Sequence, residues 1–480
     1  MPGLSDQAHR MAAISVMVVI LWVTEAIPLA IAALLGPALA VLFAVSPAKQ
    51  AFAPFSHPLI FLFLGGFMLA EALRVQGVDR RAALWMLSRR VIAGSPTRAL
   101  MGVTITAYLF SMWISNTATT AMMVPIALGL CATIGEFSRD IQRPRSDRGE
   151  HTDDVARRFD EGMLISLAYG ASLGGVATPI GTAPNIVALG ALEGHTHIDF
   201  LQWMAFATPI SLCALVGLLI WAAYRFPPVV RRIPGLRQQV RNELTALGPL
   251  RTGERRVLGI FVVTVLAWLT PSLLRLSLGE ESPITLWARN GLKEGVVAIL
   301  GASVLFMVPA KKSPHNEARL LSWSDAASID WGTLFLLGGG LAMGNLVFET
   351  GLAKAIAEVT VGQQSDPGAT LFLLAASTIL VLYMTELTSN TATTSMMIPV
   401  LIPVAQRAGV DPVPVTIIVA IAASFAFMLP VSTPPNAIVY GTGRVRLGSM
   451  IRFGAWLDIA AIVLLVASGY WFLPLFQLGE

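Results

Sequence analysis

Charged residues are scarce in this chain of 480 residues. Asp, Glu, Lys and Arg make up only 13% of the sequence, whereas hydrophobic residues make up 55%, and the mean hydropathy is +0.69. A soluble domain cannot bury this much apolar surface, so the composition excludes one and indicates a polytopic membrane protein. Charge-poor runs long enough to cross a bilayer recur along the chain, at about 11–45, 57–73, 162–192, 198–224, 257–274, 295–310, 331–348, 413–443 and 453–478.

Cysteine and histidine are too few and too scattered to build a metal centre. Cys131 and Cys213 have no ligand spacing, and among the six histidines only His195 and His197 lie close together. The basic residues are spread along loops, which argues against nucleic-acid binding. The first apolar run is about twice as long as the core of a cleavable signal peptide. The lack of Asn-x-Ser/Thr sequons and the excess of Arg over Lys suggest a bacterial inner (plasma) membrane.

One polar segment occurs twice within this apolar chain. The stretch Ser115-Asn-Thr-Ala-Thr-Thr-Ala-Met-Met-Val-Pro125 recurs as Ser389-Asn-Thr-Ala-Thr-Thr-Ser-Met-Met-Ile-Pro399, with nine of eleven positions identical. Small polar residues often join transmembrane helices by packing alone. Two nearly identical copies, each followed by a Pro-Asn interruption, instead favour a binding role.

The duplication extends beyond these segments. At the same separation of 274 residues Gly65-Gly66 falls on Gly339-Gly340, and at a separation of 251 Pro184-Asn185 falls on Pro435-Asn436. Each half contains five predicted crossings. Because five is odd, the second half enters the membrane from the opposite side, as in the inverted repeats of secondary transporters. The predicted crossings are 12–27, 29–45, 57–76, 162–190 and 200–225, then 256–275, 294–309, 331–350, 413–441 and 452–476.

Basic residues support this topology. The segments predicted to be cytoplasmic hold 25 of the 33 Lys and Arg residues, as the positive-inside rule requires. Both termini are then expected outside. The predicted organisation is an all-α polytopic membrane protein with a first inverted repeat over 1–230, a cytoplasmic linker over 231–255 and a second repeat over 256–480. The repeats include helical hairpins at 98–134 and 372–406 and interrupted helices at 162–190 and 413–441.

Each duplicated segment is predicted to form the tip of a re-entrant hairpin. A limb of 17 residues is roughly 25 Å long, so an inclined limb can pass the midplane and turn back. Such a turn is tolerated only where it is buried or lines a water-filled cavity. Ser115 or Asn116 is a good N-cap for the second limb. The helix ends at each tip then offer an anion site beside a cation site, and no Lys, Arg or His lies at either tip.

The interruptions at 182–185 and 433–436 complement the tips. Proline removes a backbone donor and frees carbonyl groups within the membrane, and oxygen ligands of this kind suit Na⁺, as they suit other hard cations. Glu71, Glu349 and Glu386 lie near the ends of predicted helices, where we expect them to be solvated or to snorkel rather than to relay protons. The basic stretch 80–98 is amphipathic and could be an interfacial arm that braces the hairpin or a plain solvated face.

These motifs closely resemble those of the divalent anion:sodium symporter family over nearly the whole chain, and the bacterial sodium/dicarboxylate transporters in particular. Gly181-Thr-Ala-Pro-Asn185, Ser432-Thr-Pro-Pro-Asn436 and Trp22-Val-Thr-Glu-Ala-Ile-Pro28 carry the resemblance together with the tips. Family members carry dicarboxylates, citrate or sulfate. The resemblance implies a homodimer that works by an elevator motion. Relatives often begin with a helix that precedes the one holding Trp22, and the resemblance leads us to expect that this helix is missing here.

The resemblance also implies specific site residues. Two departures concern sodium site 2, because Thr388 and Ser432 stand where small side chains are common, although backbone ligation would survive. Substrate contacts are expected from Ser115, Asn116, Thr117, Thr182, Ser389, Asn390, Thr391, Thr433 and Pro434. Sodium site 1 is expected from Ser111, Ser115, Asn116 and Gly181, and sodium site 2 from Thr385, Thr388, Asn390 and Ser432.

The leading hypothesis is Na⁺-coupled symport of a di- or tricarboxylate, most simply a C4-dicarboxylate such as succinate, malate or fumarate. Its partners would be this anion, sodium ions as co-transported ions, membrane lipids and a second copy of the chain, with no organic cofactor. Sodium-independent dicarboxylate exchange and Na⁺/sulfate symport remain open. A passive anion channel should line its pore continuously with polar or basic residues, and an enzyme needs a nucleophile with a base or paired carboxylates. The apolar runs show neither pattern.

Overall fold

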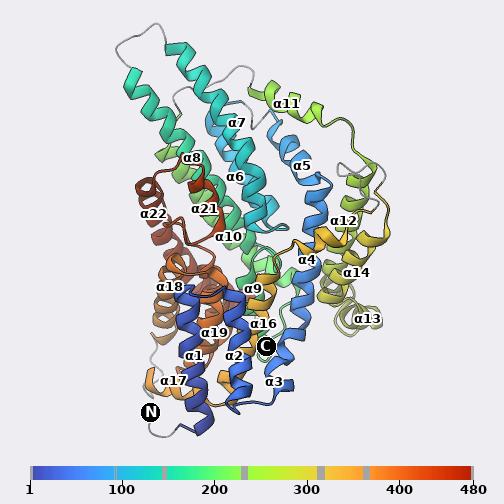
Figure 1. Cartoon of the computed structure of the whole chain (residues 1–480), viewed down its shortest axis with the longest axis vertical. Helices are drawn as coiled ribbons and strands as arrows, with labels where there is room; N and C mark the ends of the chain where they lie inside the picture. Colours follow the sequence, from blue (N-terminus) through green and yellow to red (C-terminus); the bar gives the residue numbers. More distant parts are fainter. Residues whose placement is uncertain are drawn as a thin grey trace.

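The computed structural model describes residues 4–90, 92, 94–142, 149–228, 236–310, 319–360 and 368–476. Regular structure in these residues is helical, apart from one isolated bridge between Pro309 and Arg319 (Figure 1). The first half contains α1 (Asp6–Thr24), α2 (Leu29–Leu42), α3 (Ala48–Phe52), η1 (Ala53–Ser56), α4 (Pro58–Val75), α5 (Val78–Leu87), α6 (Pro96–Ser111), α7 (Asn116–Gln142), α8 (Gly149–Val176), α9 (Ala183–Leu192) and α10 (Phe200–Arg225).

The second half follows the connecting helix α11 (Leu236–Ala246) and has a similar order of helices. Its elements are α12 (Thr252–Leu278), α13 (Pro283–Gly291), α14 (Glu294–Met307), α15 (Trp323–Ala327), α16 (Trp331–Glu349), α17 (Leu352–Thr360), α18 (Ala369–Leu387), α19 (Asn390–Arg407), α20 (Pro412–Ala423), α21 (Pro434–Gly441), α22 (Leu447–Ala467), the π-helical stretch η3 (Ser468–Phe472) and η4 (Leu473–Phe476).

Two of these helices extend into the segment predicted as a linker. α11 lies wholly within 231–255, and α12 begins at Thr252 rather than near residue 256. Glu254 caps the start of α12, where its carboxylate accepts from the Arg251 backbone N–H at 2.6 Å. Capping chemistry therefore begins the helix before its apolar run starts.

Eight helices are long and apolar enough to cross a membrane, or nine if the bent pair α13 and α14 counts as one span, among the residues described. α7 and α18 are among the eight, although the sequence predicts that they are hairpin limbs. α2 has only 14 residues, and the interrupted helices α8/α9 and α20/α21 do not pass as spans. Length and apolarity alone therefore do not separate a helix that crosses from one that turns back.

Small residues let helices from the two halves approach closely. α4 packs against α14 and α2 packs against α16. A Cβ atom on Gly65 of α4 would lie 2.5 Å from the Ala298 carbonyl carbon, and one on Gly339 of α16 would lie 2.4 Å from the Ala33 oxygen. Such distances allow glycine alone, so Gly65 and Gly339, which occupy equivalent positions in the duplication, make the same kind of contact.

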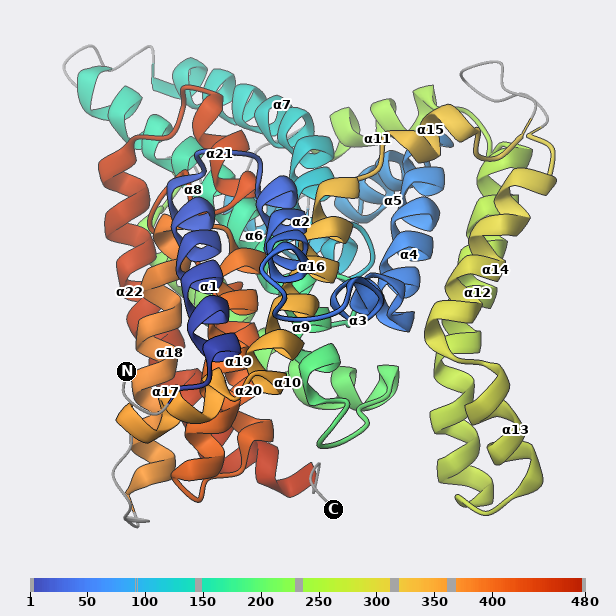
Figure 2. The same ribbon diagram turned by 60° about the horizontal axis from the view of Figure 1, so that its bottom comes forward.

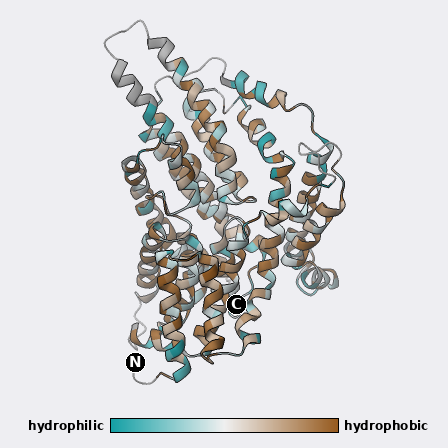
Figure 3. Cartoon of the chain, viewed as in Figure 1, coloured by the Kyte–Doolittle hydropathy of each residue, from teal (hydrophilic) through white to brown (hydrophobic). Residues whose placement is uncertain are grey.

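The short connecting helices lie toward two opposite sides of the molecule. In Figure 2, α11 and α15 lie toward the top, whereas α13, α17 and both ends of the chain lie toward the bottom. Hydrophobic residues cover most of the helices between these sides, and hydrophilic residues concentrate near helix ends and in α11 (Figure 3). Large apolar side chains on α12, such as Val263 and Leu276, are more than half exposed. Surfaces of this kind suit lipid rather than water.

Candidate functional site

Both duplicated segments line one cavity of about 520 Å³, here named the central cavity. Its floor and walls also include the interruptions between α8 and α9 and between α20 and α21. The segments lie far apart in sequence, so the fold brings the two tips and the two interruptions together, as the sequence predicts. The lining residues are Glu25, Leu29, Phe63, Phe67, Ser115, Asn116, Thr117, Gly181, Thr182, Ala183, Asp330, Thr333, Ser389, Asn390, Thr391, Val431, Ser432, Thr433, Pro434, Pro435 and Ala437.

The first tip is built where α6 ends at Ser111 and α7 begins at Asn116. The Ser115 hydroxyl accepts from the Ala118 N–H at 3.3 Å, which satisfies one free donor of the first turn. Behind the tip, the buried Ser111 hydroxyl donates to Asn116 Oδ1 at 2.6 Å. Ser111 therefore does not line the cavity but positions the Asn116 side chain within it.

The second tip repeats this geometry at equivalent positions. The buried Thr385 hydroxyl lies 2.7 Å from Asn390 Oδ1, and it also lies 2.7 Å from the Ala423 carbonyl at the end of α20. The Thr394 hydroxyl donates to the Asn390 carbonyl at 2.7 Å, just as Thr120 donates to Asn116 at 2.8 Å. The hydroxyl–amide pair is therefore a repeated structural unit of both tips.

A buried asparagine secures each interruption. The side-chain nitrogen of Asn185 lies 2.7 Å from the Thr178 carbonyl and 3.0 Å from the Gly175 carbonyl. The side-chain nitrogen of Asn436 lies 3.0 Å from the Leu429 carbonyl and 3.1 Å from the Ala426 carbonyl. Carbonyl groups freed by the break are thus hydrogen-bonded inside the protein, which a break at membrane depth requires.

The residues expected at sodium site 1 converge. A Cβ atom on Gly175 would lie 2.3 Å from Asn116 Oδ1, and one on Gly181 would lie 2.4 Å from the Gly175 carbonyl oxygen. Neither position tolerates a side chain. The tip and the interruption therefore approach closely enough for amide, hydroxyl and carbonyl oxygens to surround a small cation.

Of the residues expected at sodium site 2, Thr385 contacts Asn390, and Asn390 and Ser432 both line the central cavity. Thr388 is buried, and its hydroxyl lies 2.6 Å from the Thr393 hydroxyl. The buried Ser432 hydroxyl donates to the Leu429 carbonyl and accepts from Asn436 at 3.2 Å. Of the residues predicted to bind substrate or sodium, only Ser111, Thr385 and Thr388 do not line the central cavity.

Glu386 is not solvated, contrary to the expectation from its position near a helix end. Its side chain is buried, with 2% exposed. One carboxylate oxygen accepts from the Phe427 and Met428 N–H groups at 2.6 and 2.8 Å, and the other accepts from Leu429 at 2.9 Å. The expectation was wrong because these donors lie in the second interruption, about forty residues further along the chain. Asp458 of α22, also buried, lies close enough to interact with Glu386.

Two acidic residues in the cavity wall were not predicted from the sequence. Glu25 lies at the break between α1 and α2 with a left-handed φ of 48°, and Asp330 caps α16 by accepting from the Thr333 N–H at 3.0 Å. Both are exposed toward the cavity. Glu25 falls within the motif from Trp22 to Pro28, which was the available signal. No Lys, Arg or His is among the residues that line the cavity.

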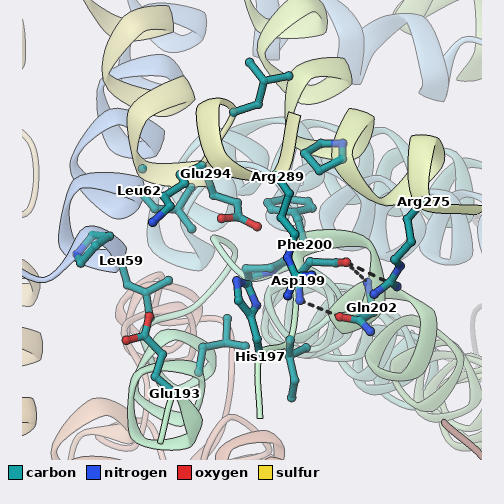
Figure 4. A pocket seen from close by; sticks show the side chains of 18 of the residues that line it. Leu59, Leu62, Glu193, His197, Asp199, Phe200, Gln202, Arg275, Arg289 and Glu294 are labelled. Carbon is teal, nitrogen blue, oxygen red and sulfur yellow. Dashed lines mark hydrogen bonds and ion pairs between the residues drawn. The ribbon is translucent and has the colours of Figure 1, made fainter. Parts of the chain in front are cut away.

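A second cavity of about 240 Å³ lies on the side of the molecule that carries α13, and the tips do not reach it. Figure 4 shows Asp199 at the start of α10 paired with Arg275 of α12, with His197 and Glu294 nearby. The Arg275–Asp199 distance is 3.5 Å, and His57 pairs with Glu193 at 2.9 Å. That hydrogen bond holds the pKa of Glu193 below its usual range. Mixed charges that largely pair with one another do not indicate an anion site.

Comparisons with known proteins place the chain in a family. Residues 1–478 match the family described as the sodium:sulfate symporter transmembrane region. A sodium-dependent dicarboxylate transporter of Staphylococcus saprophyticus is 32% identical over 476 residues, covering 98% of this chain and 87% of that protein. Its counterpart in Staphylococcus aureus strain MRSA252 is 32% identical over 470 residues, covering 96% and 85%.

Two solved structures share the fold. Neisseria gonorrhoeae MtrF, described as one of a class of antimetabolite efflux pumps, superposes with a TM-score of 0.54 at 13% identity, covering 97% of this chain and 95% of that one. The Alcanivorax borkumensis YdaH transporter gives a TM-score of 0.54 at 13% identity, covering 89% and 88%. The sequence matches assign the family and these structures support the fold alone: the chain belongs to the sodium:sulfate symporter family, the divalent anion:sodium symporters, and is a multi-pass membrane transporter rather than an enzyme.

Proposed function

We propose that this protein transports a C4-dicarboxylate, such as succinate, malate or fumarate, together with Na⁺. The observation that carries the proposal is the central cavity, in which two copies of one polar tip meet without any basic side chain. The names of the staphylococcal relatives support the same substrate class and the same coupling ion. The substrate contacts and sodium ligands proposed are those expected from the sequence.

Helix ends supply the attraction for the anion. α7, α9, α19 and α21 all begin at residues that line the cavity. Each helix start carries roughly half a positive charge on its free N–H groups. Four such ends facing one space suit a ligand with two separated carboxylates, with hydroxyls of Ser115, Thr182, Ser389 and Thr433 as further donors.

Sodium completes the charge balance. Glu25 and Asp330 place two carboxylates in the cavity wall, so a dianion entering alone meets repulsion at low effective dielectric. Cations bound behind each tip would offset that repulsion. Because the coupling between two ligands is reciprocal, the anion then raises the affinity for sodium by the same factor.

The proposed mechanism is alternating access between two inverted repeats, by an elevator motion within a homodimer. Its basis is the repeated element order and the position of both tips in one cavity. Ala437 lines the cavity and is exposed to it. In a Cys213→Ser background, Ala437→Cys should react with an impermeant thiol reagent from either side of the membrane, and sodium plus succinate should shift that balance. Labelling from one side only, unaffected by ligands, would contradict alternating access.

Uptake into proteoliposomes tests the transport function. Succinate uptake should collapse when choline replaces sodium, and unlabelled malate and fumarate should compete better than sulfate or citrate. Unchanged uptake in choline would favour sodium-independent exchange. Competition by sulfate alone would favour sulfate symport, and single-channel currents would indicate a passive channel.

A further inference from the structure

An acidic side chain is buried within α22, one of the apolar helices long enough to cross a membrane. Asp458 is 1% exposed, and neither of its carboxylate oxygens accepts a hydrogen bond from any residue that the structure describes. Among the same residues, no Lys, Arg or His forms an ion pair with it. An ionised carboxylate is costly in such surroundings, because nothing replaces the hydration that it loses. The ionised form of Asp458 is therefore unfavourable at this position.

Glu386 of α18 is the acidic neighbour of Asp458, and the two side chains lie within hydrogen-bonding reach of each other. α22 packs directly on the second interruption, because a Cβ atom on Gly454, one turn before Asp458, would lie 2.2 Å from the Phe427 carbonyl oxygen. Tyr169 of α8 is a further titratable group beside the pair, but its hydroxyl donates to the Phe427 carbonyl. Two buried carboxylates this close to each other, with no cation beside them, are not both ionised. The pair therefore holds one proton.

The hydrogen bonds around the pair determine which residue carries this proton. The Glu386 carboxylate accepts from the N–H groups of Phe427, Met428 and Leu429 at 2.6 to 2.9 Å. Donors of this kind stabilise the ionised form of a carboxyl group. Asp458 has no such donor among the described residues. The charge therefore belongs on Glu386 and the proton on Asp458, whose O–H group can form a charge-assisted hydrogen bond to its neighbour.

We propose that Asp458 is a neutral carboxylic acid in the folded protein and that its O–H group donates a hydrogen bond to the ionised Glu386. Asp458 is then a positioning residue. It fixes the Glu386 carboxylate, which in turn holds the backbone of residues 427–429, and this stretch leads to Ser432 of the proposed sodium site 2. The consequence for transport rests on the proposed function, whereas the bound proton does not.

A sodium ion between the two carboxylates is the alternative occupant. A hard cation needs several oxygen ligands, but the oxygens of Glu386 already face three N–H groups, whose positive ends would repel a cation. A proton needs only the two carboxyl groups that face each other. The two occupants also differ in what they require of Asp458, because a sodium ion needs its negative charge and the proposed hydrogen bond needs a neutral donor.

Infrared spectroscopy of the full chain in detergent tests for the proton. The spectra are recorded at about pH 8, roughly four pH units above the value at which an exposed aspartate ionises. The wild type should show the C=O stretch of a neutral carboxylic acid, and Asp458→Asn should remove that band from the spectrum. Asp411→Asn is the matched control and should leave the band unchanged, because Asp411 is an exposed acid that accepts from the Val413 N–H at 2.9 Å. A wild-type spectrum without the band, or a band of full intensity in Asp458→Asn, would overturn the proposal.

Sodium-dependent succinate uptake tests the positioning role. Asp458→Asn keeps a neutral donor, so the sodium concentration for half-maximal uptake should stay within about twofold of the wild type. Asp458→Leu has a similar size but no donor, and it should raise that concentration about tenfold, as expected for the loss of one hydrogen bond to a charged group.

The two substitutions also separate the proton from a sodium ion. If Asp458→Asn impairs uptake as much as Asp458→Leu, the negative charge of Asp458 is required, and the proposal is overturned in favour of a bound cation. Elution as one symmetric peak establishes that each variant is folded. A wild-type protein that takes up no succinate would refute the proposed function, and the infrared band would still decide whether Asp458 carries the proton.

Discussion

Glu386→Gln isolates the contribution of one buried carboxylate to sodium coupling. The carboxylate accepts from three N–H groups of the second interruption at 2.6–2.9 Å, and the same stretch of chain leads to Ser432 of the proposed sodium site 2. Glutamine has the same shape but offers one oxygen and one NH₂ group. It can keep the two bonds from Phe427 and Met428, whereas its NH₂ group must face the Leu429 N–H, which is itself a donor.

The cost follows from these contacts. One buried donor loses its partner, which costs about 1–3 kcal/mol, and two charge-assisted bonds become neutral ones of roughly half the strength. Removal of a buried charge beside Asp458 offsets part of this cost. We therefore expect the interruption to loosen by about 2 kcal/mol. If sodium must order it again, the sodium concentration for half-maximal uptake should rise about thirtyfold.

Succinate uptake into proteoliposomes over a range of sodium concentrations measures this shift. Glu349→Gln is the control, because Glu349 lies at the exposed end of α16 and its charge is removed in the same way. The temperature of thermal unfolding should change by only a few degrees in either variant. The hydrogen bonds that the variant loses are offset by the desolvation cost of the charge that it no longer buries. A half-maximal sodium concentration within about threefold of the wild type would refute the reasoning.

Three further predictions concern other parts of the molecule. Asn116→Ala and Asn390→Ala should each abolish succinate uptake while leaving the elution profile unchanged; near-normal uptake would remove the tips from the mechanism. Gly181→Ala should raise the sodium concentration for half-maximal uptake about tenfold or more, because its Cβ would lie 2.4 Å from a carbonyl oxygen. An unchanged sodium concentration would show that the interruption can shift to accommodate the added methyl group. Burial raises the pKa of Asp79 to about 6 from 3.8. The native state therefore holds this proton more tightly than the unfolded state, and the protein loses stability as pH rises from about 4 to 6. Asp79→Asn should unfold at a higher temperature than the wild type at pH 7.5 and at the same temperature near pH 4.

The tips and interruptions could be predicted because the duplication aligns the two halves of the chain residue by residue. Once Ser115 and Ser389 are aligned, Ser111 falls on Thr385 and both lie five residues before their asparagine. The structure confirms that these side chains meet. Glu386 could not be predicted in this way. Its surroundings come from residues 427–429, and nothing in the local sequence distinguishes it from Glu349.

The acidic residues of the cavity wall and the paths of the hairpin limbs could not be predicted from local sequence either. Glu25 and Asp330 lie at breaks between helices, where no periodic pattern indicates which way a side chain points. The limbs α7 and α18 are apolar and long enough to cross a membrane. Whether such a limb crosses or returns depends on the tertiary contacts of its tip, which composition does not contain.

The duplication is unequal at one position, and this has a consequence for ion release. Met112 stands where the second half has Glu386, and the first interruption is held there by a single neutral bond from the Thr178 hydroxyl to the Met112 carbonyl. The second interruption instead donates hydrogen bonds to the charged carboxylate of Glu386. At the two proposed sodium sites, this difference predicts that the ion at site 1 dissociates faster than the ion at site 2, so we expect sodium release to begin at site 1.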